Sequence, residues 1–226
     1  MKTIIVTGSE GYLGKIVADH FNERSDVRLI PVDIQLGHDL SDETLVKDFF
    51  QTNKADYLVN LFAMNDHVEE DSKQVQSLFD VSLVSLQKYY SVNVSSLFSV
   101  CREFARHNKG GIVNFTSIYG MVSPRNDMYG DSEKHIGYSI TKGAVIQMSR
   151  HLAVHLAPHV RVNCIGPGGV EKGQSNEFKE LYAKNCPFGR MMKPEEVIGL
   201  VEFLCSDSSA YMTGAVIPID GGWTAW

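Results

Sequence analysis

The apolar residues of this chain gather into short runs that alternate with longer, amphipathic stretches. The short runs are rich in β-branched residues and are apolar on both faces, which is typical of parallel strands covered by helices on either side. They predict strands at residues 4–6, 27–32, 57–61, 111–116, 160–165 and 215–219. Pro31 weakens the end of the second of these strands.

The stretches between the strands repeat their apolar residues at three and four positions, the spacing of one buried helix face. They predict helices near residues 84–107 and 138–157, and Pro194 followed by two glutamates predicts the start of another. Alternating strands and helices predict an α/β fold with a doubly wound, mostly parallel sheet of about six strands and helices on both faces. Because no linker or repeat interrupts the pattern, residues 1–226 are predicted to form a single domain.

Composition excludes several classes of protein. The 226 residues include 21 Lys and Arg against 27 Asp and Glu, a net charge of −6, which argues against a nucleic-acid-binding protein. No apolar run approaches a membrane span, and the run after Met1 is too short for a signal-peptide core. The four cysteines form no Cys-x-x-Cys pair, so we expect them to be reduced in a cytoplasmic protein.

No metal site is expected from the sequence. His151, His155 and His159 follow one another at four-residue steps, but no carboxylate joins them at ligand spacing. We therefore interpret them as an exposed or interfacial helix face.

A glycine-rich loop, Thr7 to Gly14, directly follows the first predicted strand and opens the first predicted helix. Gly8 permits a tight turn, Gly11 lets the backbone approach a pyrophosphate, and Gly14 lets the helix pack closely on the strand. The helix N-terminus offers unpaired N–H groups and a positive dipole end to the phosphates. The loop thus predicts a dinucleotide site on a Rossmann sheet.

An acidic residue at the end of the second strand bears on the choice of dinucleotide. Asp33 is placed to accept hydrogen bonds from both adenosine ribose hydroxyls and to repel a 2′-phosphate. Glu10 adds negative charge in the loop, and no Arg or Lys directly follows Asp33. NAD(H) is therefore favoured over NADP(H).

Beyond the glycine loop, four residues form a candidate catalytic group: Asn93, Ser117, Tyr138 and Lys142. Tyr138 and Lys142 are four residues apart and so share one helix face. A nearby cation is expected to lower the pKa of the phenol toward working pH. Ser117 follows the 111–116 strand, where ligands gather in open α/β sheets, and Asn93 lies in the long preceding helix.

With these residues, the chain resembles the short-chain dehydrogenase/reductase family, in its compact single-domain branch, over essentially its whole length. The matching segments are TGSEGYLG at 7–14, Asp39-Leu40, LVNLFA at 58–63, Asn93, IVNFTS at 112–117, YSITK at 138–142, VRVNCIGPGG at 160–169, and FLCSDSSAYMTG and IDGG near the end.

The resemblance implies hydride transfer between a secondary alcohol or ketone and nicotinamide. Tyr138 would be the general acid/base, Lys142 would bind the nicotinamide ribose, and Ser117 would hydrogen-bond the substrate oxygen. Asn93 would hold a helix distortion and a water that relays protons to Lys142.

The resemblance also implies a set of cofactor-binding residues, in which Asp39 contacts the adenine, Asn60 and Ala63 line the cleft, and Pro167 and Gly168 shape the loop beside the nicotinamide. The full set is Gly8, Ser9, Glu10, Gly11, Tyr12, Leu13, Gly14, Asp33, Asp39, Leu40, Asn60, Ala63, Tyr138, Lys142, Pro167, Gly168 and Val170.

The chain also departs from the family pattern. The loop spacing is typical of the extended, sugar-nucleotide branch, the glycine expected after Asn60 is missing, and Lys172 stands where the family often has Thr. The connection from Asp33 to Asp39 is too short to hold a crossover, so we predict one edge strand fewer than in relatives. The predicted strand order is 2-1-3-4-5-6.

The stretch 120–137 before Tyr138 is longer than usual and polar. It suggests a polar, anionic or sugar-derived substrate, with Arg125 as a candidate anion partner. Two other functions remain open: a sugar-nucleotide epimerase or dehydratase, whose extra substrate domain this chain lacks, and a non-catalytic dinucleotide-binding scaffold.

The long helices near 84–107 and 138–157 carry apolar residues on more than one face. Relatives bury these two helices against the same pair of a second subunit, so we expect a homodimer or homotetramer. The only other expected partner is a small-molecule substrate.

Overall fold

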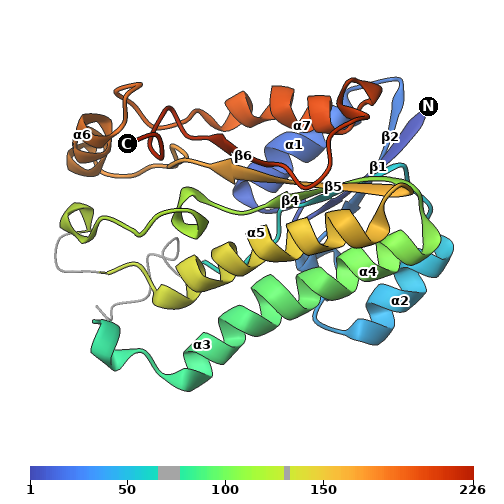
Figure 1. Ribbon diagram of the computed structural model, residues 1–226, viewed down its shortest axis with the longest axis horizontal. Coiled ribbons are helices and arrows are strands. Elements are labelled where there is room, and N and C mark those ends of the chain that lie inside the picture. The colour runs from blue at the N-terminus through green and yellow to red at the C-terminus, as the bar shows by residue number, and fades with distance from the viewer. Residues whose placement is uncertain (66–76, 130–132) are drawn as a thin grey trace.

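A six-stranded parallel sheet forms the centre of the computed structural model, which describes residues 1–65, 77–129 and 133–226 (Figure 1). Its strands are β1 (Lys2–Thr7), β2 (Val27–Val32), β3 (Tyr57–Asn60), β4 (Gly110–Phe115), β5 (Val160–Pro167) and β6 (Val216–Ile219). They lie in the order β2-β1-β3-β4-β5-β6, and every neighbouring pair is parallel. The predicted fold class and strand order are confirmed.

Helices cover both faces of the sheet (Figure 1). On one face lie α1 (Tyr12–Asn22) and α7 (Ile198–Leu204), and on the other lie α2 (Glu43–Thr52), α4 (Leu97–His107) and α5 (Ile136–Leu156). Two further helices, α3 (Leu83–Tyr90) and α6 (Asn176–Asn185), lie toward the end of the sheet where the strands finish. This arrangement leaves the carboxyl ends of the strands open to a ligand between the two helical layers.

Alternate residues of each strand enter two separate cores, as the pleat of a strand requires. Ile5 and Leu58 pack with the helices α2, α4 and α5, whereas Val6 and Val59 pack with α1 and α7. All four side chains are fully buried. The strands are therefore apolar on both faces because each face has its own helical cover.

The chain passes from β2 to α2 without another strand. Asp33 follows β2 and caps a single 3₁₀ turn, Ile34–Leu36, and Asp42 then caps α2. Among the described residues no strand lies beyond β2, which confirms the prediction of a missing edge unit. Pro31 is tolerated because β2 is this edge strand.

The two long helices bury more of their second faces inside the protomer than the sequence suggested. Several apolar residues on the second faces of these helices are buried within this chain, namely Tyr89, Val100, Ile146 and Ala153. Val154 remains 82% exposed on α5. The exposed apolar surface of these helices is thus smaller than their sequence pattern indicates.

The four cysteines are free thiols and all are buried. In the part of the chain that is described, three or more His, Cys, Asp or Glu side chains nowhere gather as metal ligands would. His151 and His155 stack on each other with ring centroids 5.8 Å apart. None of the helices in residues 1–65, 77–129 and 133–226 combines the length and apolarity needed to cross a bilayer.

Candidate functional site

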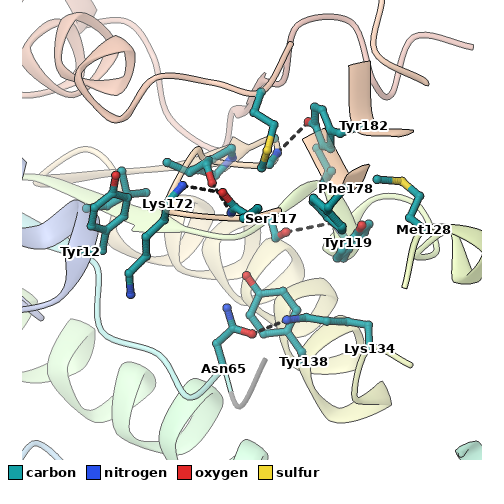
Figure 2. Close-up of a pocket in the computed structure, with 18 of the residues that line it drawn as sticks. Tyr12, Asn65, Ser117, Tyr119, Met128, Lys134, Tyr138, Lys172, Phe178 and Tyr182 are labelled. Carbon is teal, nitrogen blue, oxygen red and sulfur yellow. Dashed lines mark hydrogen bonds between the residues drawn. The ribbon is translucent and has the colours of Figure 1, made fainter. Parts of the chain in front are cut away.

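A cavity of about 800 Å³ opens at the carboxyl ends of the strands. It extends from the glycine loop, past Ser117 and Tyr138 at its centre, to the far side (Figure 2). There it is lined by Tyr119, Met128, Phe178 and Tyr182, which we call the aromatic wall. The predicted site residues that line it are Gly11, Tyr12, Leu13, Gly14, Ala63, Ser117, Tyr138, Lys142, Pro167, Gly168 and Val170. The fold therefore brings together residues from both halves of the chain.

The glycine loop is shaped by close backbone approaches. Gly8 has φ +71°, and a Cβ there would lie 2.4 Å from the backbone nitrogen of Phe62. A Cβ on Gly14 would lie 1.8 Å from the carbonyl oxygen of Gly8. Larger residues would therefore push α1 and the loop apart and close the space beside the helix N-terminus.

Ser9 gives independent support for a ligand at this loop. Its hydroxyl is buried, and among the described residues it has no hydrogen-bond partner. Buried polar groups are rarely left without a hydrogen-bond partner. A hydroxyl in this position, beside a helix N-terminus, could donate a hydrogen bond to a phosphate oxygen. The loop thus suits the pyrophosphate of a dinucleotide.

Asp33 holds the glycine loop to the end of β2. Its carboxylate accepts hydrogen bonds from the backbone N–H of Glu10 at 3.1 Å and from that of Gln35 at 3.0 Å. The side chain is nearly buried. The position of Asp33 at the end of the second strand predicted a contact with the adenosine ribose. Its hydrogen bonds to the backbone of Glu10 and Gln35 could be recognised only from the fold.

Gly8, Ser9, Glu10 and Asp33 do not line the cavity themselves, and neither do Asn60, Asp39 and Leu40. Asn60 was expected to line the cleft, but its side chain is buried beneath it, where it accepts from the Thr7 hydroxyl and donates to the Asn114 side-chain oxygen, both at 2.8 Å. It therefore ties β1, β3 and β4 together. Asp39 accepts from the Ser41 hydroxyl at 2.6 Å, and Leu40 packs against the core near α2.

Tyr138 and Lys142 lie on one face of α5, as predicted from their spacing. The Lys142 ammonium lies 5.7 Å from the centre of the Tyr138 ring and donates a hydrogen bond to the Phe115 carbonyl at 2.8 Å. Burial lowers the pKa of Lys142 to about 8. The chain therefore holds this lysine where the charged form is disfavoured.

The expectation that Lys142 lowers the pKa of Tyr138 is not met in this arrangement. Burial raises the pKa of Tyr138, and a hydrogen bond with Ser117 opposes that shift only in part. Desolvation of the phenolate is the larger effect here. The phenol is thus kept in its protonated form.

Asn93 lies in a distorted part of the helix, as the resemblance implied. Residues Ser91–Ser96 form a π-helical turn between α3 and α4. The Asn93 side-chain amide donates to the Thr141 hydroxyl at 3.0 Å and accepts from the Met64 backbone N–H at 2.7 Å. It therefore joins α5 to the segment after β3, one residue beyond Ala63.

The aromatic wall was not predicted from the sequence. Tyr119, Met128, Phe178 and Tyr182 come from the segment after β4 and from α6, and they line the far end of the cavity (Figure 2). The Tyr182 hydroxyl accepts from the Gly169 backbone N–H at 2.7 Å. These residues are scattered along the chain, so no local motif marks them.

Arg125, the predicted anion partner, does not line the cavity. It pairs with Asp127 at 3.1 Å on the surface, because a guanidinium two residues from a carboxylate finds a partner in its own loop. Lys134, from the same polar insertion, lines the cavity instead. Residues 130–132 of this insertion lie outside the described part of the chain.

At the other end of the cavity, Tyr12 crosses the cleft to the loop after β5. Its hydroxyl donates to the Glu171 carbonyl at 2.7 Å, and the Lys172 ammonium lies 5.3 Å from the centre of its ring (Figure 2). The residue that replaces the family's threonine thus faces the glycine loop.

A family model described as enoyl-(acyl carrier protein) reductase matches residues 13–224 of the chain. The 3-oxoacyl-[acyl-carrier-protein] reductase FabG of Aquifex aeolicus is 31% identical, over 97% of this chain and 86% of the reductase. This chain belongs to the short-chain dehydrogenase/reductase family. It is an oxidoreductase of the kind that acts on CH–OH groups with a nicotinamide dinucleotide.

Solved structures of this family have the same fold. A short-chain dehydrogenase of Leptospira borgpetersenii with bound NAD⁺ is 28% identical, with a TM-score of 0.86 over 99% of this chain and 92% of that one. A candidate NAD(P)-dependent gluconate 5-dehydrogenase of Beutenbergia cavernae, with NADP at low occupancy, is 25% identical, with a TM-score of 0.84 over 100% and 97% of the two chains.

Proposed function

We propose that this short-chain dehydrogenase/reductase transfers a hydride between NAD(H) and a secondary alcohol or ketone, with Tyr138 as the general acid/base. The observation that carries the proposal is the meeting of Ser117, Tyr138 and Lys142 in one cavity with the glycine loop. The residues come from the segment after β4, from α5 and from the β1–α1 connection, so this meeting depends on the fold.

A bound nicotinamide would supply or accept the hydride. The Ser117 hydroxyl would hydrogen-bond the substrate oxygen, and the Tyr138 phenol would donate its proton to that oxygen as the carbonyl is reduced. Because burial raises the pKa of Tyr138, the phenol stays protonated and suits reduction. Lys142 would bind the ribose hydroxyls of the nicotinamide half, where its pKa of about 8 leaves it mostly charged at neutral pH.

The preference for NAD(H) is supported by charge at the adenine end. The Asp33 carboxylate is held in place by two backbone N–H groups, and Glu10 lies beside it. A ribose 2′-phosphate would meet this carboxylate without a compensating guanidinium next to it in sequence. The structure of the gluconate 5-dehydrogenase relative contains NADP at low occupancy, and the titration below compares the two dinucleotides directly.

Titration of the intrinsic fluorescence with NADH and NADPH tests the cofactor choice, and we expect NADH to bind more tightly. A screen of hydroxy and keto compounds, sugars included, followed through NADH absorbance then tests turnover. Tyr138→Phe removes the transferable proton and is expected to lower turnover by about 10²–10⁴-fold. NADH affinity should barely change.

These measurements also separate the alternatives. A dinucleotide-binding scaffold would bind NADH but turn over nothing in the screen. A sugar-nucleotide epimerase or dehydratase restores its NAD in every turnover and leaves the NADH absorbance unchanged, so it is tested by chromatography of nucleotide sugars incubated with the enzyme and NAD⁺. Near-normal turnover of Tyr138→Phe would exclude Tyr138 as the acid/base. We also propose a cytoplasmic location, which four buried free thiols support.

A further inference from the structure

We propose that Lys134 binds the carboxylate of the substrate, so that the natural substrate is an oxo acid or the corresponding hydroxy acid. This inference rests on the proposed function and gives the substrate a chemical class. It also assigns a role to a residue of the polar insertion that the catalytic chemistry does not use.

Lys134 lies directly beside the proposed acid/base. Its ammonium is 4.4 Å from the centre of the Tyr138 ring, closer than the 5.7 Å of the Lys142 ammonium. It also donates a hydrogen bond to the side-chain oxygen of Asn65, which lines the cavity as well (Figure 2). A substrate whose carbonyl reaches Tyr138 therefore has Lys134 within a few bonds of its reacting carbon.

The position of Lys134 relates it to the substrate and not to the dinucleotide. Lys172 faces Tyr12 at the glycine-loop end of the cavity, and Lys142 donates to the Phe115 carbonyl at the end of β4. Lys134 and Asn65 instead lie across the Tyr138 ring from Ser117 (Figure 2).

The charges of the described lining residues also favour an anion. With Lys142 and Lys172 on the dinucleotide side, Lys134 is the remaining lysine among the described lining residues, and the lining carboxylates are those of Asp127 and Glu177. Asp127 is ion-paired with Arg125 at 3.1 Å, and Glu177 is exposed to solvent. A substrate carboxylate would be a stronger acceptor for Lys134 than the neutral Asn65 oxygen, because hydrogen bonds between ionised groups are about twice as strong as neutral ones.

The aromatic wall indicates what the rest of the substrate is like. Tyr119, Met128 and Phe178 lie across the cavity from Lys134 and offer an apolar surface (Figure 2). An oxo acid with an apolar chain or ring would place its carboxylate on Lys134 and its body on this wall. Reduction would move a hydride to the carbonyl carbon and the Tyr138 proton to the oxygen, with NADH becoming NAD⁺.

The test compares acids with their neutral esters on the full-length enzyme with NADH. Suitable pairs are acetoacetate with methyl acetoacetate, and phenylpyruvate with methyl phenylpyruvate. We expect the native enzyme to have a kcat/KM about 10–100-fold higher for the acid of a pair, since a charge-assisted hydrogen bond is worth that factor. An ester used as well as its acid would overturn the inference without any variant.

Substitutions then assign the effect to Lys134. Lys134→Met is expected to remove most of the preference for the acid through KM, and Lys134→Arg is expected to keep it. Lys109→Met removes the same charge from an exposed position outside the cavity and should leave the preference intact. If Lys134→Met instead slows the acid and the ester equally and shifts the pH profile of both, Lys134 positions or tunes Tyr138 and the proposal is wrong.

Binding separates this inference from the proposed function. Calorimetry measures the affinity of each acid and ester for the native and Lys134→Met enzymes saturated with NAD⁺. Acid binding that depends on Lys134 without turnover would support the carboxylate site while the proposed reaction fails. Equal binding of acid and ester, or no binding of any acid at millimolar concentration, would refute the site.

Discussion

Replacing Lys142 with Met should make the dinucleotide-free enzyme more stable while abolishing its turnover. Burial lowers the pKa of Lys142 from 10.5 to about 8 in the folded protein. Below pH 8 both the folded and the unfolded chain carry the protonated lysine, so the folded state bears the whole cost of burying that charge. Above pH 8 the folded state loses the proton first, and the cost shrinks as the pH rises toward 10.5.

The magnitude follows from the shift. At about 1.36 kcal/mol per pKa unit, the cost is about 3 kcal/mol at pH 7 and about 1 kcal/mol at pH 9.5. Met has nearly the length of Lys and removes the charge, but it also removes the hydrogen bond to the Phe115 carbonyl, worth about 1 kcal/mol. Lys142→Met should thus raise the free energy of unfolding by about 2 kcal/mol at pH 7 and hardly at all at pH 9.5.

Urea unfolding of both proteins without dinucleotide, at one protomer concentration and at both pH values, measures this difference. Lys109→Met is the control, because that lysine is exposed and its removal should shift stability little at either pH. A Lys142→Met enzyme less stable than the native one at pH 7, or a difference that is the same at both pH values, would refute the reasoning.

The glycine loop and the assembly give further predictions. Gly14→Ala should lower NADH affinity by at least 10-fold and destabilise the protein by about 1–3 kcal/mol, because its Cβ would collide with the Gly8 carbonyl oxygen. Gly199→Ala in α7 is the matched control: its Cβ meets nothing within 4 Å, so it should be neutral or stabilise by up to about 1 kcal/mol. Light scattering should give the mass of a homodimer or, as we expect, a homotetramer at micromolar concentration; a mass of 25.2 kDa that stays constant on dilution would show a monomer.

The strands of the sheet, and the functional residues that follow their carboxyl ends, could be predicted from the sequence. Strand and helix periods are local properties, and the short link after Asp33 excludes another crossover by length alone. The order β2-β1-β3-β4-β5-β6 was predicted with the help of the family resemblance, because the handedness of crossovers alone does not fix the strand at which the order reverses. The same order brings the ends of β1, β4 and β5 together, so the glycine loop, Ser117 and Pro167 were predictable as neighbours.

The directions of the polar side chains, and the effect of burial on the pKa values of Tyr138 and Lys142, depend on the folded structure. Asn60 lies near the end of a predicted strand, yet its side-chain amide hydrogen-bonds to Thr7 and Asn114 on the neighbouring strands, and Ala63 lines the cavity instead. Lys142 was expected to lower the pKa of Tyr138, but desolvation acts on both groups and raises the pKa of the phenol. Desolvation depends on all the atoms that surround a group in the folded protein, so it cannot be predicted from the spacing of residues in the sequence.

The substrate end of the cavity depended most on the fold. Arg125 and Lys134 belong to one polar insertion and look equivalent in the sequence, but Arg125 pairs with its neighbour Asp127 and only Lys134 reaches Tyr138. The aromatic wall joins Tyr119 to Phe178 across much of the chain. Local patterns encode elements and their order, whereas contacts between distant loops arise only when the whole chain has folded.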